Sequence, residues 1–353
     1  MAEWRTTIDD APVPTKHTAY ALHITRYAPR DTHHALMRIA RPLSVGTTLL
    51  LAVIAGVGSA VIGVEATPWG AWVGAVPTML ILGVGLRRSL RRWRLAQKGC
   101  PDAWRQWLTR HIPVYPRLDA DATDRFERDV LFVMHEFSFE GVKGVSVTDE
   151  LRLSVAAGVA LLLHGHPDWE LPGTRSVLFY PDRFDDAYEG GDYASYDGMA
   201  HEQGPLILTA ASVRESWTRP DDGNNVVLHE LAHLFDFQNT GPDGVPSFVD
   251  PASAGSWQAL VRREMRRVRE RRSMLRPYAA EAPSEFFAVA VEAFFEQPHR
   301  MARAHQKLFA ALAAFFQIDP RTGDAIAAGD ALRATDSEAS DQEAPSPKRF
   351  KAP

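Results

Sequence analysis

Two long stretches without a charged side chain lie near the N-terminus and constrain the fold more than any other feature. Leu43–Val64 is uncharged over 22 residues, and Ala66–Leu86 follows after a single glutamate, Glu65. As a helix, each stretch is long enough to cross the roughly 30 Å hydrocarbon core of a membrane. The pattern predicts a transmembrane helical hairpin over residues 43–86, preceded by a polar cytoplasmic tail over residues 1–42.

Cationic side chains lie at both ends of this hairpin, and both ends lie on the same side of the membrane that the hairpin would cross. Arg38 and Arg41 precede it, and six cationic residues follow it between positions 87 and 98. By the positive-inside rule, both ends of the hairpin face the cytoplasm. We therefore expect a protein of the bacterial inner membrane whose main domain faces the cytoplasm. The alternative is a cytoplasmic protein that buries the two helices in its core.

The composition limits what the remaining chain can do. Its 353 residues are 45% hydrophobic and 24% charged, which is typical of a globular protein. A formal net charge of −5 argues against attraction of the whole surface to nucleic acid, so we expect no direct nucleic-acid binding. The single cysteine, Cys100, cannot form an intrachain disulfide and excludes cysteine-rich structural zinc modules.

After the hairpin, the pattern divides into three further segments. Residues 87–112 form a basic connector, residues 113–330 a domain of mixed helices and strands, and residues 334–353 a polar, disordered tail. Helical spacing and short apolar runs bounded by Pro or Gly mark the elements of the mixed domain. The predicted helices are Asp124–Met134, Glu150–Leu163, Asn224–Phe237, Trp257–Leu275 and Ser284–Phe295, and the predicted strands are Val177–Tyr180 and Leu206–Thr209.

The strongest chemical signal is the pentapeptide His229-Glu230-Leu231-Ala232-His233. On a helix, His229 and His233 project from one face, so both imidazoles can reach one zinc ion, while Glu230 can contact a metal-bound water. The apolar residues around this motif predict burial, and buried histidines need partners. The segment His135-Glu136 lacks a second histidine at this spacing, and we expect it to be ordinary helix surface.

Two histidines leave a catalytic zinc one protein ligand short. A third histidine ten residues after the first is missing, because that position is Asn239. A downstream apolar helix instead carries Glu285, Glu292 and Glu296 at spacings that place them on one stripe. A carboxylate buried there needs a cation, but spacing alone leaves the choice between Glu285 and Glu292 open.

Two further residues have predicted supporting roles. Asp236 follows His233 by three residues and is placed to orient an imidazole from outside the ligand set. Tyr278 lies near the start of the glutamate-bearing helix, where its phenol can reach a developing oxyanion; a buried packing role is the alternative.

The chain resembles the Mlc titration factor family of glucose-regulated zinc metallopeptidases, whose active site is related to lethal-factor-type zincins. The resemblance covers roughly residues 104–320 and rests on five blocks in the family's order. These blocks are Val177-Leu-Phe-Tyr-Pro, Gln203-Gly-Pro-Leu-Ile-Leu-Thr, Asn225-Val-Val-Leu-His-Glu-Leu-Ala-His-Leu-Phe-Asp, Gly244-Val-Pro and Tyr278-Ala-Ala-Glu-Ala-Pro-Ser-Glu-Phe-Phe-Ala-Val-Ala-Val-Glu-Ala-Phe-Phe. The hairpin is no part of the family's shared core.

The resemblance implies an α+β, zincin-like metallopeptidase domain with a small mixed sheet, placed after the transmembrane hairpin. It implies that His229, His233 and Glu285 hold one zinc ion, with Glu292 outside the ligand set. Glu230 is then the general base for a metal-activated water that hydrolyses a peptide or protein substrate, and Tyr278 assists. By analogy with other zincins, the strand Leu206–Thr209 is expected at the sheet edge, where an extended peptide can lie.

Two interpretations remain open. A membrane-tethered regulatory protein could sequester a transcriptional repressor, as the family's partner suggests, with the zinc site secondary. Separately, the helix expected over Trp257–Leu275 is rich in arginine, which we interpret as a solvated face, with contact to anionic lipid as the second interpretation. The arginines of this region are Arg262, Arg263, Arg266, Arg267, Arg269, Arg271, Arg272 and Arg276.

Overall fold

The structure is a computed structural model of the full chain. It describes residues 42–66, 75–166, 168–173, 175–181, 198–199, 204–236 and 251–326. The tail predicted over residues 334–353 and all but the last residue of the tail predicted over residues 1–42 lie outside these ranges. So do Asn239 and the Gly244-Val-Pro block of the family resemblance.

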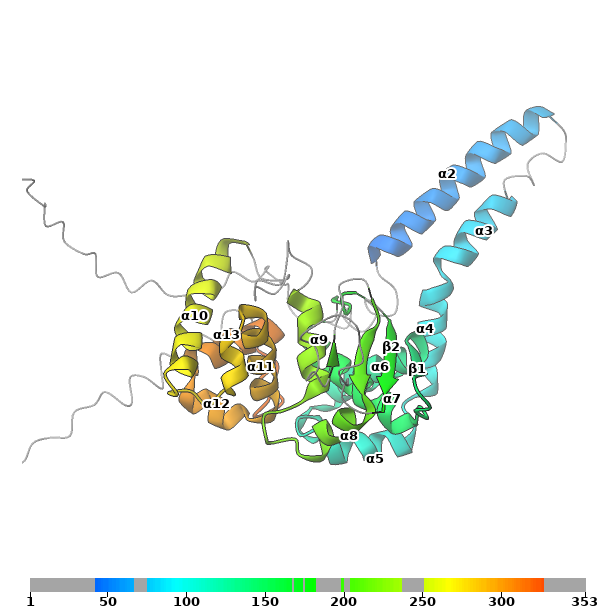
Figure 1. The fold of residues 1–353 in the computed structure, drawn as a ribbon. Coiled ribbons are helices and arrows are strands. Elements are labelled where there is room, and N and C mark those ends of the chain that lie inside the picture. Colours follow the sequence, from blue (N-terminus) through cyan, green and yellow to red (C-terminus); the bar gives the residue numbers. More distant parts are fainter. Residues whose placement is uncertain are drawn as a thin grey trace, which may run out of the picture.

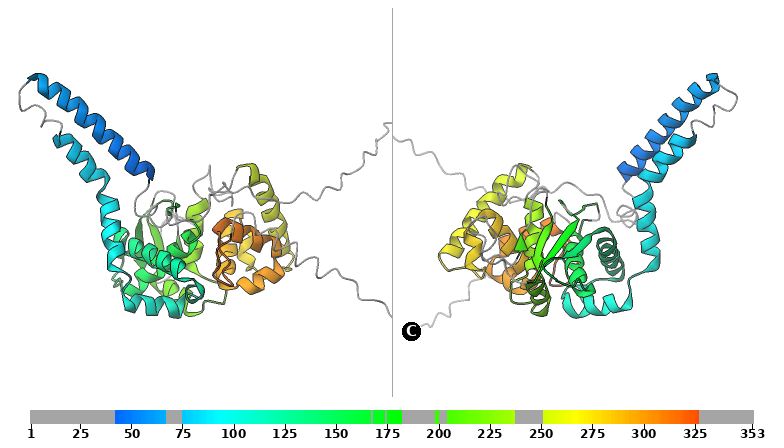
Figure 2. Two further views of the ribbon diagram at one scale, coloured as in Figure 1. Left: turned by 180° about the vertical axis from the view of Figure 1, so that it is seen from behind. Right: turned by 45° about the vertical axis from the view of Figure 1, so that its right-hand side comes forward.

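The predicted N-terminal hairpin forms two helices, α2 (Pro42–Ala66) and α3 (Ala75–Gly85). They lie side by side and project away from the rest of the molecule (Figures 1 and 2). Their assignment as membrane spans is not supported, because no helix in the described part of the chain combines the length and the hydropathy needed to cross a membrane. With 11 residues, α3 is about 16 Å long, well short of the hydrocarbon thickness.

The predicted connector at residues 87–112 is also helical, forming α4 (Arg87–Lys98) and α5 (Asp102–His111). One face of α4 packs on α6 (Ala120–Glu136). There Glu136 accepts hydrogen bonds from both Arg88 and Arg92. The prediction that His135-Glu136 is ordinary helix surface was therefore wrong for Glu136, whose side chain is 9% exposed.

The sheet has four strands in the order β1-β2-β4-β3. β1 (Ser138–Gly141), β2 (Ser176–Tyr180) and β4 (Leu206–Thr209) are parallel to one another, and β3 (Gly198–Met199) is antiparallel to β4. In register, Val177 lies opposite Leu206, and Phe179 lies opposite Leu208. The mixed sheet agrees with the prediction, but the expected edge position of Leu206–Thr209 was wrong, because β3 pairs with β4 on its outer side.

Helices surround this sheet and carry the predicted motifs. α7 (Asp149–Leu163) packs against α6, α8 (Ala210–Thr218) and α9 (Val226–Asp236), and α9 also contacts β3 and β4. The approach of α7 to α9 requires Gly158, where an added Cβ would lie 2.7 Å from Val227 Cγ1 and 3.0 Å from Leu231 Cδ1. This glycine lets the helix that carries both histidines lie close against the core.

A second group of helices follows in the chain. It contains α10 (Pro251–Arg269), the 3-10 helix η3 (Pro277–Ala280), α11 (Pro283–Glu296), α12 (Pro298–Ala304) and α13 (Gln306–Phe316). α11 packs along α9, which therefore lies between this group and the sheet with its helices (Figure 1). Phenylalanines fill the centre of the group: Phe287, Phe294, Phe315 and Phe316 are buried against one another. The predicted helix Trp257–Leu275 ends six residues early, and Arg271 follows with φ 55°.

Candidate metal centre

The first turn of α9 is fixed by side chains that bind its free backbone N–H groups. Asn225 precedes the helix, and its Oδ1 accepts a hydrogen bond from the Leu228 N–H at 3.0 Å. Ser216 Oγ accepts from the Val226 N–H, also at 3.0 Å. Because the first N–H groups of a helix have no partner inside it, these contacts define where α9 begins.

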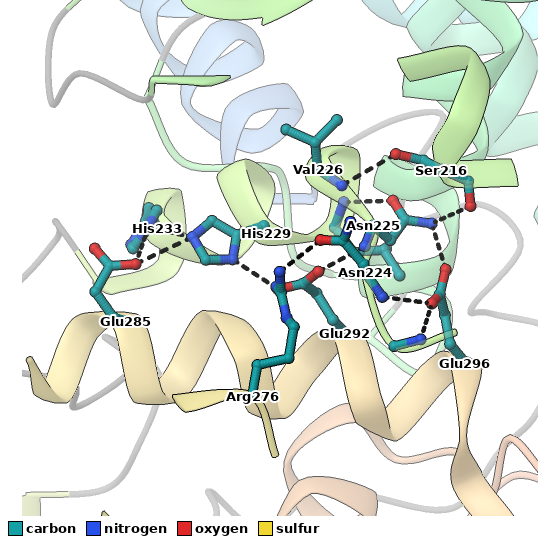
Figure 3. Close-up of polar contacts among 12 residues, drawn as sticks. Ser216, Asn224, Asn225, Val226, His229, His233, Arg276, Glu285, Glu292 and Glu296 are labelled. Carbon is teal, nitrogen blue, oxygen red and sulfur yellow. Dashed lines mark hydrogen bonds and ion pairs between the residues drawn. The ribbon is translucent and has the colours of Figure 1, made fainter. Parts of the chain in front are cut away.

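Two carboxylates of α11 complete this arrangement (Figure 3). Glu296 accepts from the backbone N–H groups of Gly223 and Asn224, at 2.9 and 3.0 Å, and from Asn225 Nδ2 at 3.0 Å. Glu292 accepts from the Asn225 N–H at 2.6 Å. These hydrogen bonds connect α9 to α11, and negative charge on Glu292 is favourable at this helix N-terminus. Burial nevertheless raises the pKa of Glu296 to about 8, since the hydrogen bond from Asn225 offsets it only in part.

Three ligand atoms meet between α9 and α11. His229 Nε2 and His233 Nε2 are 3.3 Å apart, and Glu285 Oε2 lies 3.1 Å from the first and 3.6 Å from the second. Ligands about 2.05 Å from a zinc ion at tetrahedral angles are separated by about 3.3 Å. The three distances therefore match one face of a zinc coordination tetrahedron, and these residues could hold a metal ion.

Glu292 lies behind the imidazole of His229 rather than among the ligand atoms. His229 Nδ1–H donates to Glu292 Oε1 at 2.7 Å, which leaves Nε2 directed toward Glu285 and His233 (Figure 3). The guanidinium of Arg276 donates to the same Glu292 oxygen, and its other nitrogen donates to Asn224 Oδ1 at 2.6 Å. Glu292 is fully buried, so Arg276 and His229 provide the positive charge and the hydrogen bonds that its carboxylate needs.

The electrostatics of this cluster favour a cation. Burial lowers the pKa of His229, but Glu292 and Glu285 outweigh it and raise the pKa to about 10. Burial raises the pKa of Glu285, but hydrogen bonds from the two histidines outweigh it and hold the pKa well below its usual range. A divalent ion would satisfy the same carboxylate while leaving the imidazoles neutral.

The remaining predicted residues lie around this cluster. Glu230 is buried, and burial is the main reason that its pKa is raised. Tyr278, on η3, places its ring centroid 5.9 Å from that of His229. Asp236 is fully buried at the last position of α9, three residues after His233. The structure thus gathers Tyr278, Glu285, Glu292 and the α9 motif, which are separated by up to 63 residues in the chain.

Three residues of this arrangement make contacts that the sequence pattern did not predict. Arg276 was counted as part of a cationic helix face, but it lies after the end of α10 and binds Glu292. Asn225 and Glu296 were left without a role, although they connect α9 to α11. The four-residue spacing of Glu292 and Glu296 carried a signal, because it places both carboxylates on one face of α11.

The model of the glucose-regulated metallo-peptidase M90 family matches residues 86–317. The chain belongs to this family. The match begins one residue before α4 and extends past the last residue of α13, so it includes the sheet and both helices that carry the candidate ligands. The family supports a metallopeptidase domain, and the cluster of His229, His233 and Glu285 is a group within it that could bind the metal.

Individual relatives agree with this assignment. An uncharacterized protein of Synechocystis is 28% identical over 251 residues, which cover 65% of this chain and 89% of that protein. Mlc titration factor A of Enterobacter is 29% identical over 250 residues, covering 65% of this chain and 91% of that protein. Mlc titration factor A of Escherichia coli is 31% identical over 169 residues, which cover 43% of this chain and 62% of that protein.

Proposed function

We propose that this metallopeptidase domain hydrolyses peptide bonds with one zinc ion held by His229, His233 and Glu285. The observation that carries the proposal is the spacing of their three ligand atoms at 3.1, 3.3 and 3.6 Å. A set of two imidazoles and one carboxylate is typical of catalytic zinc, where three protein ligands leave a coordination position for water or substrate. Structural zinc sites more often have four protein ligands.

A zinc ion bound here would polarise the scissile carbonyl and lower the pKa of a water molecule. Glu230 is the general base in this mechanism: its carboxylate takes a proton from the attacking water and then passes it to the departing amine. Its raised pKa suits this exchange, because a base whose pKa lies nearer the working pH both accepts and returns a proton readily.

Two further side chains support this chemistry. Tyr278 would donate its hydroxyl hydrogen to the oxygen of the scissile carbonyl as negative charge develops there. Glu292 holds the Nδ1–H of His229, and this contact fixes the tautomer in which Nε2 carries the free electron pair. The role predicted for Asp236, orienting an imidazole, remains part of the proposal.

Replacing Glu230 tests the mechanism most directly. Glu230→Gln keeps the shape of the side chain but removes the base, so we expect cleavage of fluorescein-labelled casein to fall by about 10²–10⁴-fold. Zinc content, measured by mass spectrometry, should stay at one ion per chain. Glu150→Gln makes the same change on an exposed side chain of α7 and should alter neither quantity.

The outcomes separate the steps of the proposal. Full casein cleavage by Glu230→Gln would show that the general-base assignment is wrong. Wild-type protein that contains zinc but cleaves neither casein nor a mixed peptide library, with or without chelator, would argue against peptidase activity altogether.

A second candidate function comes from the relatives named Mlc titration factor A. We propose that this chain also binds a transcriptional regulator of the Mlc type, in which case sequestration rather than cleavage could be its main activity. The test uses purified Mlc from Enterobacter and the Glu230→Gln variant. Binding by the variant at wild-type affinity, measured by calorimetry, would support sequestration independent of catalysis, and no binding by either form would contradict it.

A further inference from the structure

The most exposed large hydrophobic side chains of the described residues all lie between positions 49 and 93. Seven lie on α2, four on α3 and two on α4, and their exposed fractions reach 74% at Met79. They are Leu49, Leu50, Leu51, Val53, Ile54, Val57, Val61, Val76, Met79, Leu80, Val84, Leu90 and Trp93. A contiguous apolar surface of this kind marks a site that another molecule covers.

The packing of α2 and α3 leaves this surface open. Their contact with each other buries Ala52, and Thr78 Oγ1 donates to the Ala52 carbonyl at 3.2 Å. Within the described residues, α2 packs mainly on α3, and α3 packs on α2 and α4. The pair extends away from the metallopeptidase domain in all three views (Figures 1 and 2), so that domain does not cover the outward faces.

α4 adds a cationic stripe at the base of this pair. Arg87, Arg91, Arg94 and Lys98 are exposed and recur at spacings of four, three and four residues, which places them on one face of the helix. Residues 66–101 contain no aspartate or glutamate. The exposed Trp93 precedes Arg94 on α4, and tryptophan is enriched at the boundary between hydrocarbon and lipid headgroups.

The charges on the face of α4 that packs against the domain are neutralised. Arg88 and Arg92 form ion pairs with Glu136 and Glu170, and Glu170 also pairs with Arg175. These contacts hold α4 against the domain and satisfy the charges of its inner face. Of the outward cations, Arg91 donates to the His135 carbonyl of α6 at 2.7 Å, whereas Arg87, Arg94 and Lys98 are exposed and remain available to an anionic partner.

We propose that the α2–α3 pair enters the hydrocarbon of an anionic lipid bilayer while Arg87, Arg94 and Lys98 bind headgroup phosphates. Apolar side chains beyond a row of cations match the layers of a bilayer with acidic lipids. A second copy of this chain is the less suitable occupant, because it would cover the apolar faces but would supply no anionic groups for the cationic stripe. The proposal does not depend on the zinc site.

Vesicle flotation with the full chain tests this inference. We expect wild-type protein to float with vesicles of phosphatidylglycerol and phosphatidylcholine, and to bind less strongly to phosphatidylcholine alone or at high ionic strength. Arg87→Gln/Arg94→Gln should weaken binding to the anionic vesicles about 30-fold, since each surface cation contributes about fivefold. Binding to the neutral vesicles should not change.

Two further variants complete the test. Arg262→Gln/Arg266→Gln on α10 removes the same charge from another exposed surface and should bind like wild type. Ile54→Asp/Leu80→Asp changes two exposed apolar side chains, so it should fold normally by circular dichroism but fail to float with either vesicle.

Three results would overturn the proposal. Wild-type protein that does not float is the first. An equal loss of binding in the α10 variant would show general charge attraction instead of recognition by α4. A wild-type dimer that becomes monomeric in Ile54→Asp/Leu80→Asp, without vesicle binding by either form, would identify a second copy as the occupant.

Discussion

The α9–α11 pair and the α2–α3 pair differ in which side chains they bury and which they expose to solvent. Between α9 and α11, the carboxyl groups of Glu292 and Glu296 are buried, and hydrogen bonds from protein groups compensate each of them. On α2 and α3, leucine, valine and methionine side chains are exposed. Both arrangements cost free energy in an isolated chain, but only the first is compensated within the described residues.

This difference separates two kinds of functional surface. A buried polar cluster pays its desolvation cost once, during folding, and keeps a fixed geometry that can position a metal ion and its substrate. An exposed apolar surface gains free energy only when a partner covers it. This contrast predicts four outcomes, in order of decreasing effect.

Loss of a metal ligand should have the largest effect. His233→Ala removes one of three ligand atoms, so we expect zinc to be lost on dialysis and casein cleavage to fall by at least about 10³-fold, because the metal supplies several kcal/mol to the reaction. His299→Ala changes an exposed histidine of α12 and serves as the control. Stoichiometric zinc in His233→Ala would place the metal elsewhere.

Shortening one apolar side chain in each region should have unequal effects on the free energy of unfolding. Phe287 is fully buried and contacts Trp257 and Phe315, so Phe287→Ala should lower the free energy of unfolding by about 3–5 kcal/mol. Leu50→Ala should change it by less than about 0.5 kcal/mol, because Leu50 is exposed. Urea denaturation followed by circular dichroism measures the free energy of unfolding of both variants. Equal losses of stability would contradict the difference between the two regions.

Arg276 should affect zinc affinity without touching the ligand atoms. Arg276→Gln removes the charge that compensates Glu292, and Glu292 in turn holds His229, so we expect zinc affinity to fall about 10–100-fold in competition with a chelator. Arg271→Gln, on an exposed residue five positions earlier, is the control. Partial recovery of Arg276→Gly with added guanidinium would confirm a local role, and unchanged affinity in Arg276→Gln would exclude it.

The smallest effect concerns the ion pairs that hold α4. Burial raises the pKa of Glu136, but hydrogen bonds from Arg92 and Arg88 outweigh it and lower the pKa to about 2, from an unfolded value of 4.5. The stabilisation is therefore present above pH 4.5 and is lost as the pH falls toward 2. We expect Glu136→Gln to be less stable than wild type by about 1 kcal/mol at pH 7. This difference should shrink between pH 4.5 and 2, and a constant difference would contradict the assignment.

Local patterns were sufficient to predict the elements that carry the site. The spacing of His229 and His233 predicted one helix face, and the apolar run around Glu285 predicted the other helix; both helices are present within three residues of the expected limits. The choice of Glu285 over Glu292 required family resemblance. Spacing alone cannot show that Glu285 on the first turn of α11 faces the two histidines, while Glu292 and Glu296 near its end face the N-terminus of α9.

Long-range pairings were not predictable in the same way. Nothing local indicates that Glu136 binds Arg92, 44 residues earlier, or that β3 would pair outside β4 and move the latter from the edge. The apolar run of residues 43–86 and its end at Leu86 were visible in the sequence, but the length of α3, only 11 residues, was not.

The closeness of α7 and α9 at Gly158 has a consequence for how this sequence can vary. Val227 and Leu231, the side chains nearest to the missing methyl group, stand on the helix that carries both histidines. A larger residue at position 158 would shift the histidines relative to Glu285 although it touches none of them. Such a change would be tolerated only together with a smaller side chain at position 227. Positions 158 and 227 are therefore expected to change together, with a smaller residue at one restoring the packing that a larger residue at the other disturbs.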